Sequence, residues 1–407
     1  MARFTGAEWD KVLAFLDEHH ARFGLPQQRA DSVVMASFNI RKLGKVKKRS
    51  NQSWEFLKRF CQRCDLIAVQ EVQDNLEGIN YLKGLMGGNY GMVCSDITGG
   101  VPGATAMVER LAFIFHWPTI ERTEVASDIS YDRSAVIGKL FDNRVDFSKD
   151  FKKYALAITA WEKKVSAWKD GGKHGDKPEK PPFVLSNFVT FIRTPYCVSF
   201  RIPGFDGALP YELLAVNAHL LYGDASKQKQ ERRMEFDALI EWIISRAKQR
   251  DRLYHKNIIL LGDMNLDFEE VDARRDEIRA KIMDLNKTIF KSLKAAKVNF
   301  PFLDVHKGQE EVFRSNARLN QTYDQIGLFS HDKRLPLDKE NDTAGGTAGG
   351  FDFGVFNFVD LFSEALHGKP LMDISDNQQK ALYEKFENDV SDHMPIWIRL
   401  PKPYAGQ

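Results

Sequence analysis

Several short apolar runs of the sequence end at a side chain that can bind a metal ion or move a proton. They are Asn39 in FNIR, Glu71 in VQEV, His219 in NAHL, and Asp263 with Asn265 in LLGDMN. Carboxylate and amide oxygens suit hard cations, and a histidine near its ordinary pKa transfers protons at neutral pH. In open α/β sheets, sites gather beyond the carboxyl ends of the strands. The recurrence therefore predicts one shared pocket.

Each of these signals also has a plainer structural interpretation. A glutamate after an apolar run, such as Glu71, commonly starts a helix or faces solvent, and a lone histidine is commonly a satisfied or solvated imidazole. Asp392 and His393, in VSDHMPIWIRL, precede an apolar run, and neighbours in extended chain point apart. They can share a site only if the preceding loop turns both inward. Asp324 in TYDQIGLF could be a turn or capping residue.

The apolar runs themselves predict the elements that position these residues. Their length and β-branched content are typical of strands covered on both faces, and the segments between them are typical of helices and loops. The predicted strands are SVVMASFNI, DLIAVQEV, LAFIFHW, CVSFRI, ELLAVNAHL, NIILLGDMN, DQIGLF and MPIWIRL. The predicted helices are residues 7–22, WEFLKRFCQRC and KQERRMEFDALIEWIISRAKQ. The alternation predicts an α/β fold.

Three stretches are predicted to be insertions into this pattern. Residues 142–182 carry Phe151, Tyr154, Ile158, Trp161, Val165 and Trp168 at helical spacing, followed by the basic loop KDGGKHGDKPEKPP. Residues 267–320 carry an apolar stripe at Ile278, Ile282, Leu285, Ile289 and Leu293. Residues 332–350 end in the tandem repeat TAGGTAGG. We expect residues 1–30 to form a helical lead-in and residues 31–401 to form one domain.

The charge balance restricts how the chain can bind a polyanion. It has 58 basic and 56 acidic side chains and a net charge of +2, so it is not a polycation. Binding to a polyanion would therefore need a local basic patch. Residues 41–49, RKLGKVKKR, are the candidate, although a solvated loop would have the same composition.

The sequence also argues against several classes of protein. It contains no run of roughly 18 apolar residues, and acids and histidines interrupt its start where a signal peptide is apolar. We therefore expect a soluble, cytoplasmic protein with no membrane partner. Four cysteines make a disulfide framework improbable in a chain of this length. Cys61 and Cys64 lack a second pair at zinc-ligand distance, which favours two buried thiols.

The order of eight short motifs resembles that of a known superfamily. FNIR, QEV, ERxxF, RTPY, NxHL, GDxN, YDxI and SDHxP follow one another from residue 37 to about residue 400. This order resembles the endonuclease/exonuclease/phosphatase superfamily, most closely its deoxyribonuclease I-like branch. The resemblance implies a four-layer α/β sandwich, in which two packed mixed β-sheets are flanked by helices.

The resemblance also implies binding roles for the candidate residues. The metal ion would be Mg²⁺, with Mn²⁺ as an alternative, and would be bound by Glu71, Asn39 and Asp392. The phosphate would be held by Arg193 in RTPY, by Arg41 and by Asn265. Asp263 and Asn265 would contact the attacked phosphate and the nucleophilic water.

Two acid-oriented histidines complete the implied catalytic set. His219 would be oriented by Glu109, and His393 by Asp324. We assign His393 to activation of the attacking water and His219 to protonation of the leaving oxygen, although the two roles could be exchanged or the metal ion could take one of them. The product of a phosphodiester would then carry a 5′-phosphate and a 3′-hydroxyl.

The catalytic set alone does not name the substrate. The basic stretch after the first catalytic strand, the setting of Arg193 and the two histidine pairs favour DNA. The backbone contacts would come from Lys42, Lys45, Lys47, Lys48 and Arg49. Gln73 and Met107 stand where the deoxyribonuclease I-like enzymes carry an arginine and a tyrosine that enter or flank the minor groove of a duplex. We therefore keep a single-stranded or structured nucleic acid as an alternative substrate. The alternatives are a phosphatase, a phosphodiesterase of phospholipids or inositol phosphates, and a non-catalytic nucleic-acid-binding module.

Overall fold

The structure is a computed structural model of the chain. The residues it describes are 2–98, 108–129, 133–181, 183, 185–186, 190–222, 226–248, 255, 257–265, 297–303, 313–330, 332–345 and 350–405. The predicted apolar stripe between Ile278 and Leu293 lies outside these residues, as do Met107 and residues 346–349 of the TAGGTAGG repeat.

One six-stranded sheet is built around the strand predicted from SVVMASFNI. Its strands, in spatial order, are β11 (Asp352–Val355), β12 (Ile396–Pro401), β1 (Ser32–Leu43), β2 (Leu66–Gln73), β4 (Glu109–His116) and β3 (Tyr90–Cys94). β1 and β2 run parallel, while the other neighbours run antiparallel. The sheet is therefore mixed, and its two central parallel strands end on the same side.

The second sheet repeats this plan. Its strands, in spatial order, are β5 (Glu121–Asp128), β6 (Tyr196–Ile202), β7 (Tyr211–His219), β8 (Asn257–Asp263), β10 (Asp324–Ser330) and β9 (Lys297–Asn299). Here β7 and β8 are the parallel pair. They also end on one side of their sheet.

The two sheets pack face to face and share one core. The ring of Phe200 in β6 contacts the rings of Phe113 and Phe115 in β4, with centroids 5.5 Å apart in both pairs. Apolar residues of both sheets belong to the same buried cluster. This packing explains why the central strands are apolar on both faces.

A short line of polar side chains crosses this core, and we call it the polar seam. Asn217 of β7 donates to the carbonyl oxygens of Val69 (3.1 Å) and Ala112 (2.9 Å) in the other sheet. Gln70 Nε2 donates to Asn217 Oδ1 at 2.7 Å. Gln70 and Asn217 are both fully buried. Buried amides are stable only when hydrogen-bonded, so these bonds fix one sheet against the other.

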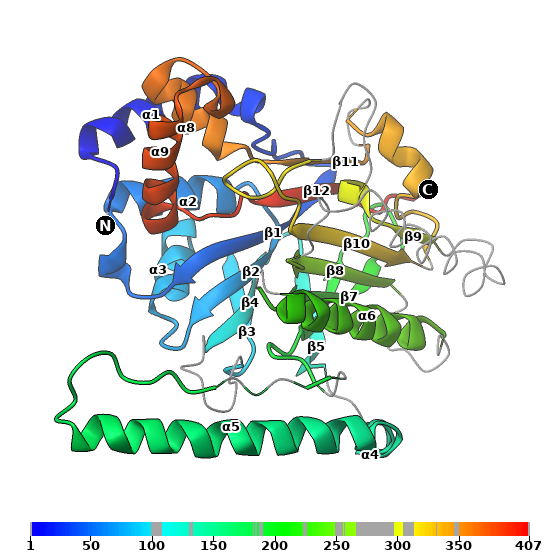
Figure 1. The fold of residues 1–407 in the computed structure, drawn as a ribbon. Helices are drawn as coiled ribbons and strands as arrows, with labels where there is room; N and C mark the ends of the chain where they lie inside the picture. The colour runs from blue at the N-terminus through cyan, green and yellow to red at the C-terminus, as the bar shows by residue number, and fades with distance from the viewer. Residues whose placement is uncertain are drawn as a thin grey trace.

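Helices cover the outer face of the first sheet (Figure 1). They are α1 (Gly6–His19), α2 (Asn51–Cys61), α3 (Glu77–Met86), α8 (Phe358–His367) and α9 (Asp376–Asp389). Thr5 caps α1 in a capping box with Glu8, and Trp9 packs edge-on against Phe362 of α8. The predicted opening helix is confirmed. It ends in a 3₁₀ turn, η1 (His20–Phe23).

Helix α6 (Ser226–Lys248) covers the outer face of the second sheet. Short 3₁₀ helices occur at η2 (Val46–Lys48), η4 (Pro301–Leu303), η5 (Asp338–Thr343) and η6 (Leu371–Asp373). The layers are thus helix, sheet, sheet, helix. The predicted four-layer α/β sandwich is confirmed.

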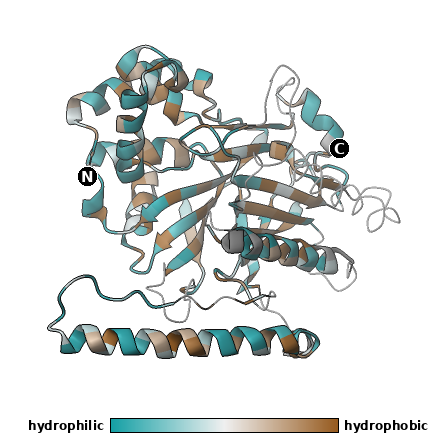
Figure 2. Cartoon of the chain, viewed as in Figure 1, coloured by the Kyte–Doolittle hydropathy of each residue, from teal (hydrophilic) through white to brown (hydrophobic). Residues whose placement is uncertain are grey.

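The first predicted insertion is a long helix that stands apart from the two sheets (Figure 1). This helix is α5 (Arg144–Asp170), along which hydrophobic and hydrophilic residues alternate (Figure 2). A further helix, α4 (Arg133–Asp142), precedes it and lies before the predicted start of the insertion at residue 142. The returning chain covers part of the apolar stripe. Phe183 lies against Tyr154, and Trp161 Nε1 donates to the carbonyl of Pro178.

Cys61 and Cys64 are free and buried, as expected of small core residues. Among the helices described, none has both the length and the apolar composition needed to cross a lipid bilayer.

Candidate active site

Strand register places three candidate residues side by side in the second sheet. His219 lies opposite Asp263 across the parallel pair β7 and β8. Asp324 lies opposite Asp263 across the antiparallel pair β10 and β8. Gly262 makes this approach possible, because a Cβ atom there would collide with the carbonyl of Ala218. The glycine of LLGDMN therefore serves close packing of the strands beside the site.

Asp263 is the centre of the site. Its Oδ2 lies 3.0 Å from Asn39 Nδ2, 3.4 Å from His219 Nε2 and 3.5 Å from His393 Nε2. Its Oδ1 accepts the backbone N–H of Asn265 at 2.9 Å. Burial alone would raise the pKa of Asp263. The charges of His393 and His219 and the two hydrogen bonds hold that pKa below its usual value.

His219 is oriented by a buried acid, as predicted. Its Nδ1 lies 2.5 Å from Glu109 Oε1, and the same oxygen lies 2.6 Å from Arg193 Nε. Burial and Arg193 both favour the neutral imidazole, but Glu109 and Asp263 outweigh them and raise the pKa of His219 above its usual value. Glu109 keeps a lowered pKa despite its burial, because His219 and Arg193 face it. This arrangement leaves Nε2 as the atom that faces the site.

His393 has a matching partner. Its Nδ1 lies 2.9 Å from Asp324 Oδ2, and the backbone N–H of Asp324 donates to Ser315 Oγ. Burial works against the charged imidazole, yet Asp263 and Asp324 raise the pKa of His393 well above its usual value. The loop before β12 therefore does turn His393 inward. Both predicted histidine pairs are present.

A group of three residues here has the composition of a metal site that the sequence analysis did not predict. Asp263, Asp324 and His393 bring potential ligand atoms within 4.8 Å of one another. However, both imidazole nitrogens of His393 already face a carboxylate oxygen. The arrangement therefore suits proton transfer better than metal binding.

The predicted metal side has oxygen atoms that lack partners. Asn39 Nδ2 lies 3.3 Å from Glu71 Oε1, and Glu71 Oε2 accepts the backbone N–H of Lys42. Asn39 Oδ1 and Asp392 Oδ1 are buried and accept no hydrogen bond from the residues described. Glu71 has a positive φ of 58°, at an irregularity in the pairing of β2 with β4. Such oxygen donors fit Mg²⁺ or Mn²⁺.

Arg41 makes ion pairs with two carboxylates beside this metal side. Its Nη1 lies 2.7 Å from Glu387 and 3.6 Å from Asp392. Burial would lower the pKa of Arg41, but Asp392 and Glu387 raise it. Arg41 is therefore close to the candidate metal residues, and its contact with phosphate stays a prediction.

Ser391 is a site residue that the sequence analysis missed, although it stands inside the SDHxP motif. Its Oγ donates to the carbonyl of Asn39 at 2.7 Å. It also accepts the backbone N–H groups of Arg41 and His393, each at 3.2 Å. One buried hydroxyl thus ties the end of β1 to the loop that carries His393. Its position as the first residue of the SDHxP motif is the sequence feature that could have identified it.

The basic stretch 41–49 is not one open loop. It comprises the end of β1, the 3₁₀ helix η2 and the residues around it, and the side chains that face solvent are those of Lys42, Lys45, Lys47 and Lys48. Arg49 differs from the prediction, because it is buried and donates to the carbonyls of Arg41 and Val390. Burial lowers the pKa of Arg49 to about 10. It cannot reach a nucleic-acid backbone in this position.

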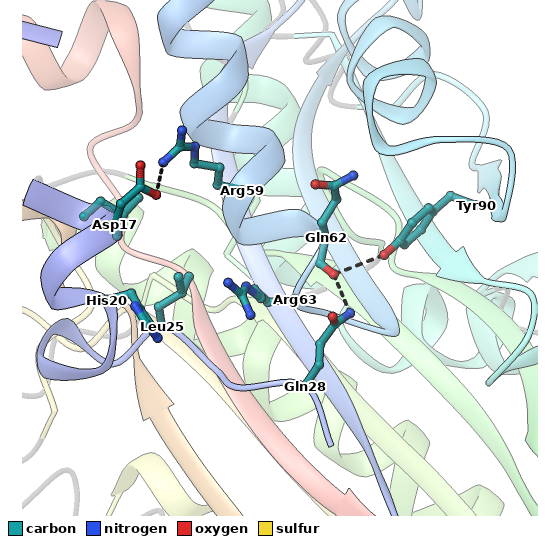
Figure 3. Close-up of a pocket in the computed structure, with 9 residues that line it drawn as sticks. Asp17, His20, Leu25, Gln28, Arg59, Gln62, Arg63 and Tyr90 are labelled. Atoms are coloured by element: carbon teal, nitrogen blue, oxygen red, sulfur yellow. Dashed lines mark hydrogen bonds and ion pairs between the residues drawn. The ribbon is translucent and has the colours of Figure 1, made fainter. Parts of the chain in front are cut away.

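A separate pocket lies among α1, α2 and β3 (Figure 3). It has a volume of about 610 Å³ and is lined by Leu16, Asp17, His20, Leu25, Gln28, Arg59, Gln62, Arg63 and Tyr90. Gln28 and Tyr90 both donate to the carbonyl of Gln62. None of the predicted site residues lines this pocket. The candidate active site is therefore elsewhere, at the strand ends.

This chain is similar to known proteins in structure only. No protein-family model matches the chain, and no curated protein matches its sequence. An endonuclease/exonuclease/phosphatase family protein from Bacteroides thetaiotaomicron is 12% identical over 92% of this chain and 98% of its own, with a TM-score of 0.42. The human Nocturnin catalytic domain is 10% identical over 92% and 96%, with a TM-score of 0.44. D. rerio TDP2 complexed with a single-strand DNA product is 13% identical over 90% and 98%, with a TM-score of 0.40.

The first of these structures belongs to the superfamily that the order of the motifs resembles. At such identities and TM-scores, the likeness carries no information about activity. The chemistry must come from the residues of the site.

Proposed function

We propose that this protein is a metal-dependent phosphodiesterase, and that it is a DNA endonuclease. One observation carries the proposal. Two buried imidazoles, each backed by its own carboxylate, face the same oxygen of Asp263. Hydrolysis of a phosphodiester needs one group to take a proton from water and another to give a proton to the leaving alkoxide. Two oriented histidines in one site meet both needs.

The proton transfers follow from the two pairs. His393 takes a proton from the attacking water at Nε2 when its imidazole is neutral, a form that its raised pKa restricts to higher pH, and Asp324 stabilises the resulting imidazolium. His219 gives a proton from Nε2 to the leaving oxygen, and Glu109 keeps Nδ1 protonated and the ring in place. If the two histidines exchanged these roles, the overall reaction would be the same. Hydrolysis yields one 5′-phosphate and one 3′-hydroxyl.

The phosphate itself is negatively charged and must be neutralised. We assign Arg193 and Asn265, which are buried beside Glu109 and Asp263, to contact with its oxygens. Glu71, Asn39 and Asp392 would hold Mg²⁺ or Mn²⁺. When bound, such a cation withdraws charge from a non-bridging oxygen and lowers the pKa of a coordinated water. The unpartnered oxygens of Asn39 and Asp392 support this assignment.

DNA is the substrate we infer, because exposed lysines follow the first catalytic strand. Lys42, Lys45, Lys47 and Lys48 lie on the chain that leaves the site after Asn39. Exposed lysines spaced along a surface can contact successive backbone phosphates. A phosphatase has no need of a surface that extends beyond one phosphate.

The test is incubation of the purified chain with supercoiled plasmid in the presence of Mg²⁺, Mn²⁺ or EDTA. We expect nicking with either metal, none with EDTA, and 5′-phosphate ends on the fragments. Inositol phosphates and a chromogenic phosphodiester are assayed in parallel. Release of phosphate from inositol phosphates without nicking of the plasmid would identify a phosphatase and contradict the nuclease proposal. Inactivity on all substrates would remove the hydrolase proposal and leave a binding module.

A further inference from the structure

Helix α6 carries a carboxylate on its buried face. Phe236, Leu239 and Ile243 of this helix belong to the apolar cluster under the second sheet. Glu235 lies next to Phe236 and is only 3% exposed. A carboxylate is costly to bury unless hydrogen bonds satisfy it, so its partners must account for its place there.

The two oxygens of Glu235 accept hydrogen bonds from two different loops of the candidate active site. Oε1 accepts the backbone N–H of Ile192 at 2.7 Å, and Oε2 accepts that of Leu221 at 2.9 Å. Ile192 directly precedes Arg193, and Leu221 comes two residues after His219. The carboxylate therefore joins the chain that delivers the arginine to the chain that delivers the histidine.

The peptide bond between Leu220 and Leu221 carries this link into the site. Its N–H donates to Glu235, and its carbonyl accepts from Arg193 Nη1 (3.2 Å) and Asn265 Nδ2 (3.0 Å). A peptide group is planar, so its N–H and its carbonyl cannot turn independently. Fixing the N–H at Glu235 thus fixes the direction of the carbonyl that positions both side chains.

We propose that Glu235 is a positioning residue of the active site, which aligns Arg193 and Asn265 through the Leu220–Leu221 peptide. This inference rests on the proposed phosphodiesterase function. Glu235 touches no substrate, and its effect on turnover is indirect. Burial raises the pKa of Glu235, whereas the two N–H donors and the charges of Arg193 and His219 act in the opposite direction.

The same network gives a signal that can be followed without substrate. Arg193 Nε and His219 Nδ1 share one oxygen of Glu109. If Arg193 moves, the hydrogen bond between His219 and Glu109 must change its strength. The proton between His393 and Asp324 belongs to a different pair, which meets this network only through Asp263, so it should be affected less.

The test compares Glu235→Gln with Glu241→Gln, a control on an exposed turn of the same helix. A glutamine can accept only one of the two N–H groups and turns an NH₂ toward the other. We expect kcat on a chromogenic phosphodiester to fall roughly 10- to 100-fold, as for other residues that orient site ligands. The downfield imidazole proton of His219, assigned by its loss in His219→Asn, should shift more than that of His393, which is linked to Asn265 only through Asp263. The control should change neither quantity.

The outcomes separate this inference from the function on which it rests. An inactive wild-type protein would contradict the proposed function, and the imidazole signals would still test the positioning. Wild-type kcat and unshifted signals in Glu235→Gln would overturn the positioning role. Should that variant not fold, Glu235→Asp keeps the charge but is too short to bridge both loops, and the same losses are expected. Failure of both variants to fold would make Glu235 a stability residue only.

Discussion

His219 and His393 direct their Nε2 atoms at the same carboxylate oxygen, at 3.4 and 3.5 Å. They reach it from β7 and from the loop before β12, which belong to different sheets. Each has a separate carboxylate on its Nδ1. Two proton carriers therefore act on one small volume, each with its own carboxylate on Nδ1, while the charge of Asp263 raises the pKa of both.

Replacement of either histidine should remove most of the activity. For His219→Asn and His393→Asn we expect kcat to fall between about 100- and 10,000-fold, because each removes one proton transfer. Plasmid nicking and turnover of a chromogenic phosphodiester are the measurements. His174→Asn, in an exposed turn, is the matched control. Turnover at the wild-type rate in either site variant would contradict the role given to that histidine.

Replacement of the metal-side glutamate should weaken cation binding. Glu71→Gln removes the charge of a candidate ligand, and we expect Mg²⁺ affinity to fall roughly tenfold or more, at least as much as the loss of an outer-shell partner costs. Titration calorimetry without substrate is the measurement. Asp74→Asn, an exposed neighbour just after β2, controls for the lost charge. An unchanged Mg²⁺ affinity in Glu71→Gln would move the metal site away from this residue.

Removal of the exposed lysines should flatten the salt dependence of DNA binding. Each phosphate contact contributes about 0.9 to the slope of log K against log salt, so the triple change of Lys45, Lys47 and Lys48 to Gln should reduce it by about 2.7. Fluorescence anisotropy on duplex DNA with EDTA measures the slope. The control changes Lys11, Lys369 and Lys380 to Gln, which removes the same charge from other exposed sites. Equal slopes in the two triple variants would place the DNA contact elsewhere.

The pair of His219 and Glu109 should make stability depend on pH. The pKa of His219 is raised in the folded protein, so between the ordinary value of 6.5 and the folded value the native state holds a proton that unfolding releases. The stabilisation is complete below pH 6.5 and is lost as pH rises through the folded pKa. Urea unfolding in EDTA should show that wild type exceeds His219→Asn by more at about pH 6 than at about pH 9. A constant difference would argue against an ionised pair.

The sequence predicted the central strands and missed the edges. All eight apolar runs became strands, whereas β3, β5, β9 and β11 were not predicted. These four lie at the two ends of each sheet. An edge strand packs less of its surface, and β5 is exposed or half-buried along its whole length. It therefore carries no apolar run from which it could be predicted.

Site residues could be predicted where the motif residues themselves carry the chemistry. They could not be predicted where packing determines whether a side chain is buried and what it contacts. The register of three strands brings His219, Asp263 and Asp324 together. The strand-end positions indicated this for His219 and Asp263, and the resemblance implied it for Asp324. Arg49 looked identical to its lysine neighbours, and only its packing over Trp54 and its backbone partners reveal it as a buried residue. Glu235 lies in the middle of an amphipathic helix, where nothing local distinguishes it from a solvated acid.

The polar seam of Gln70 and Asn217 lies directly before Glu71 and two residues before His219 in their strands. Because the reactive groups come from both halves of the sandwich, neither half contains a competent site by itself. Any opening wide enough to admit solvent between the halves would break these amide bonds and separate the reactive groups at once. Loss of activity and loss of cooperative structure should therefore coincide, without a loosened yet working form between them.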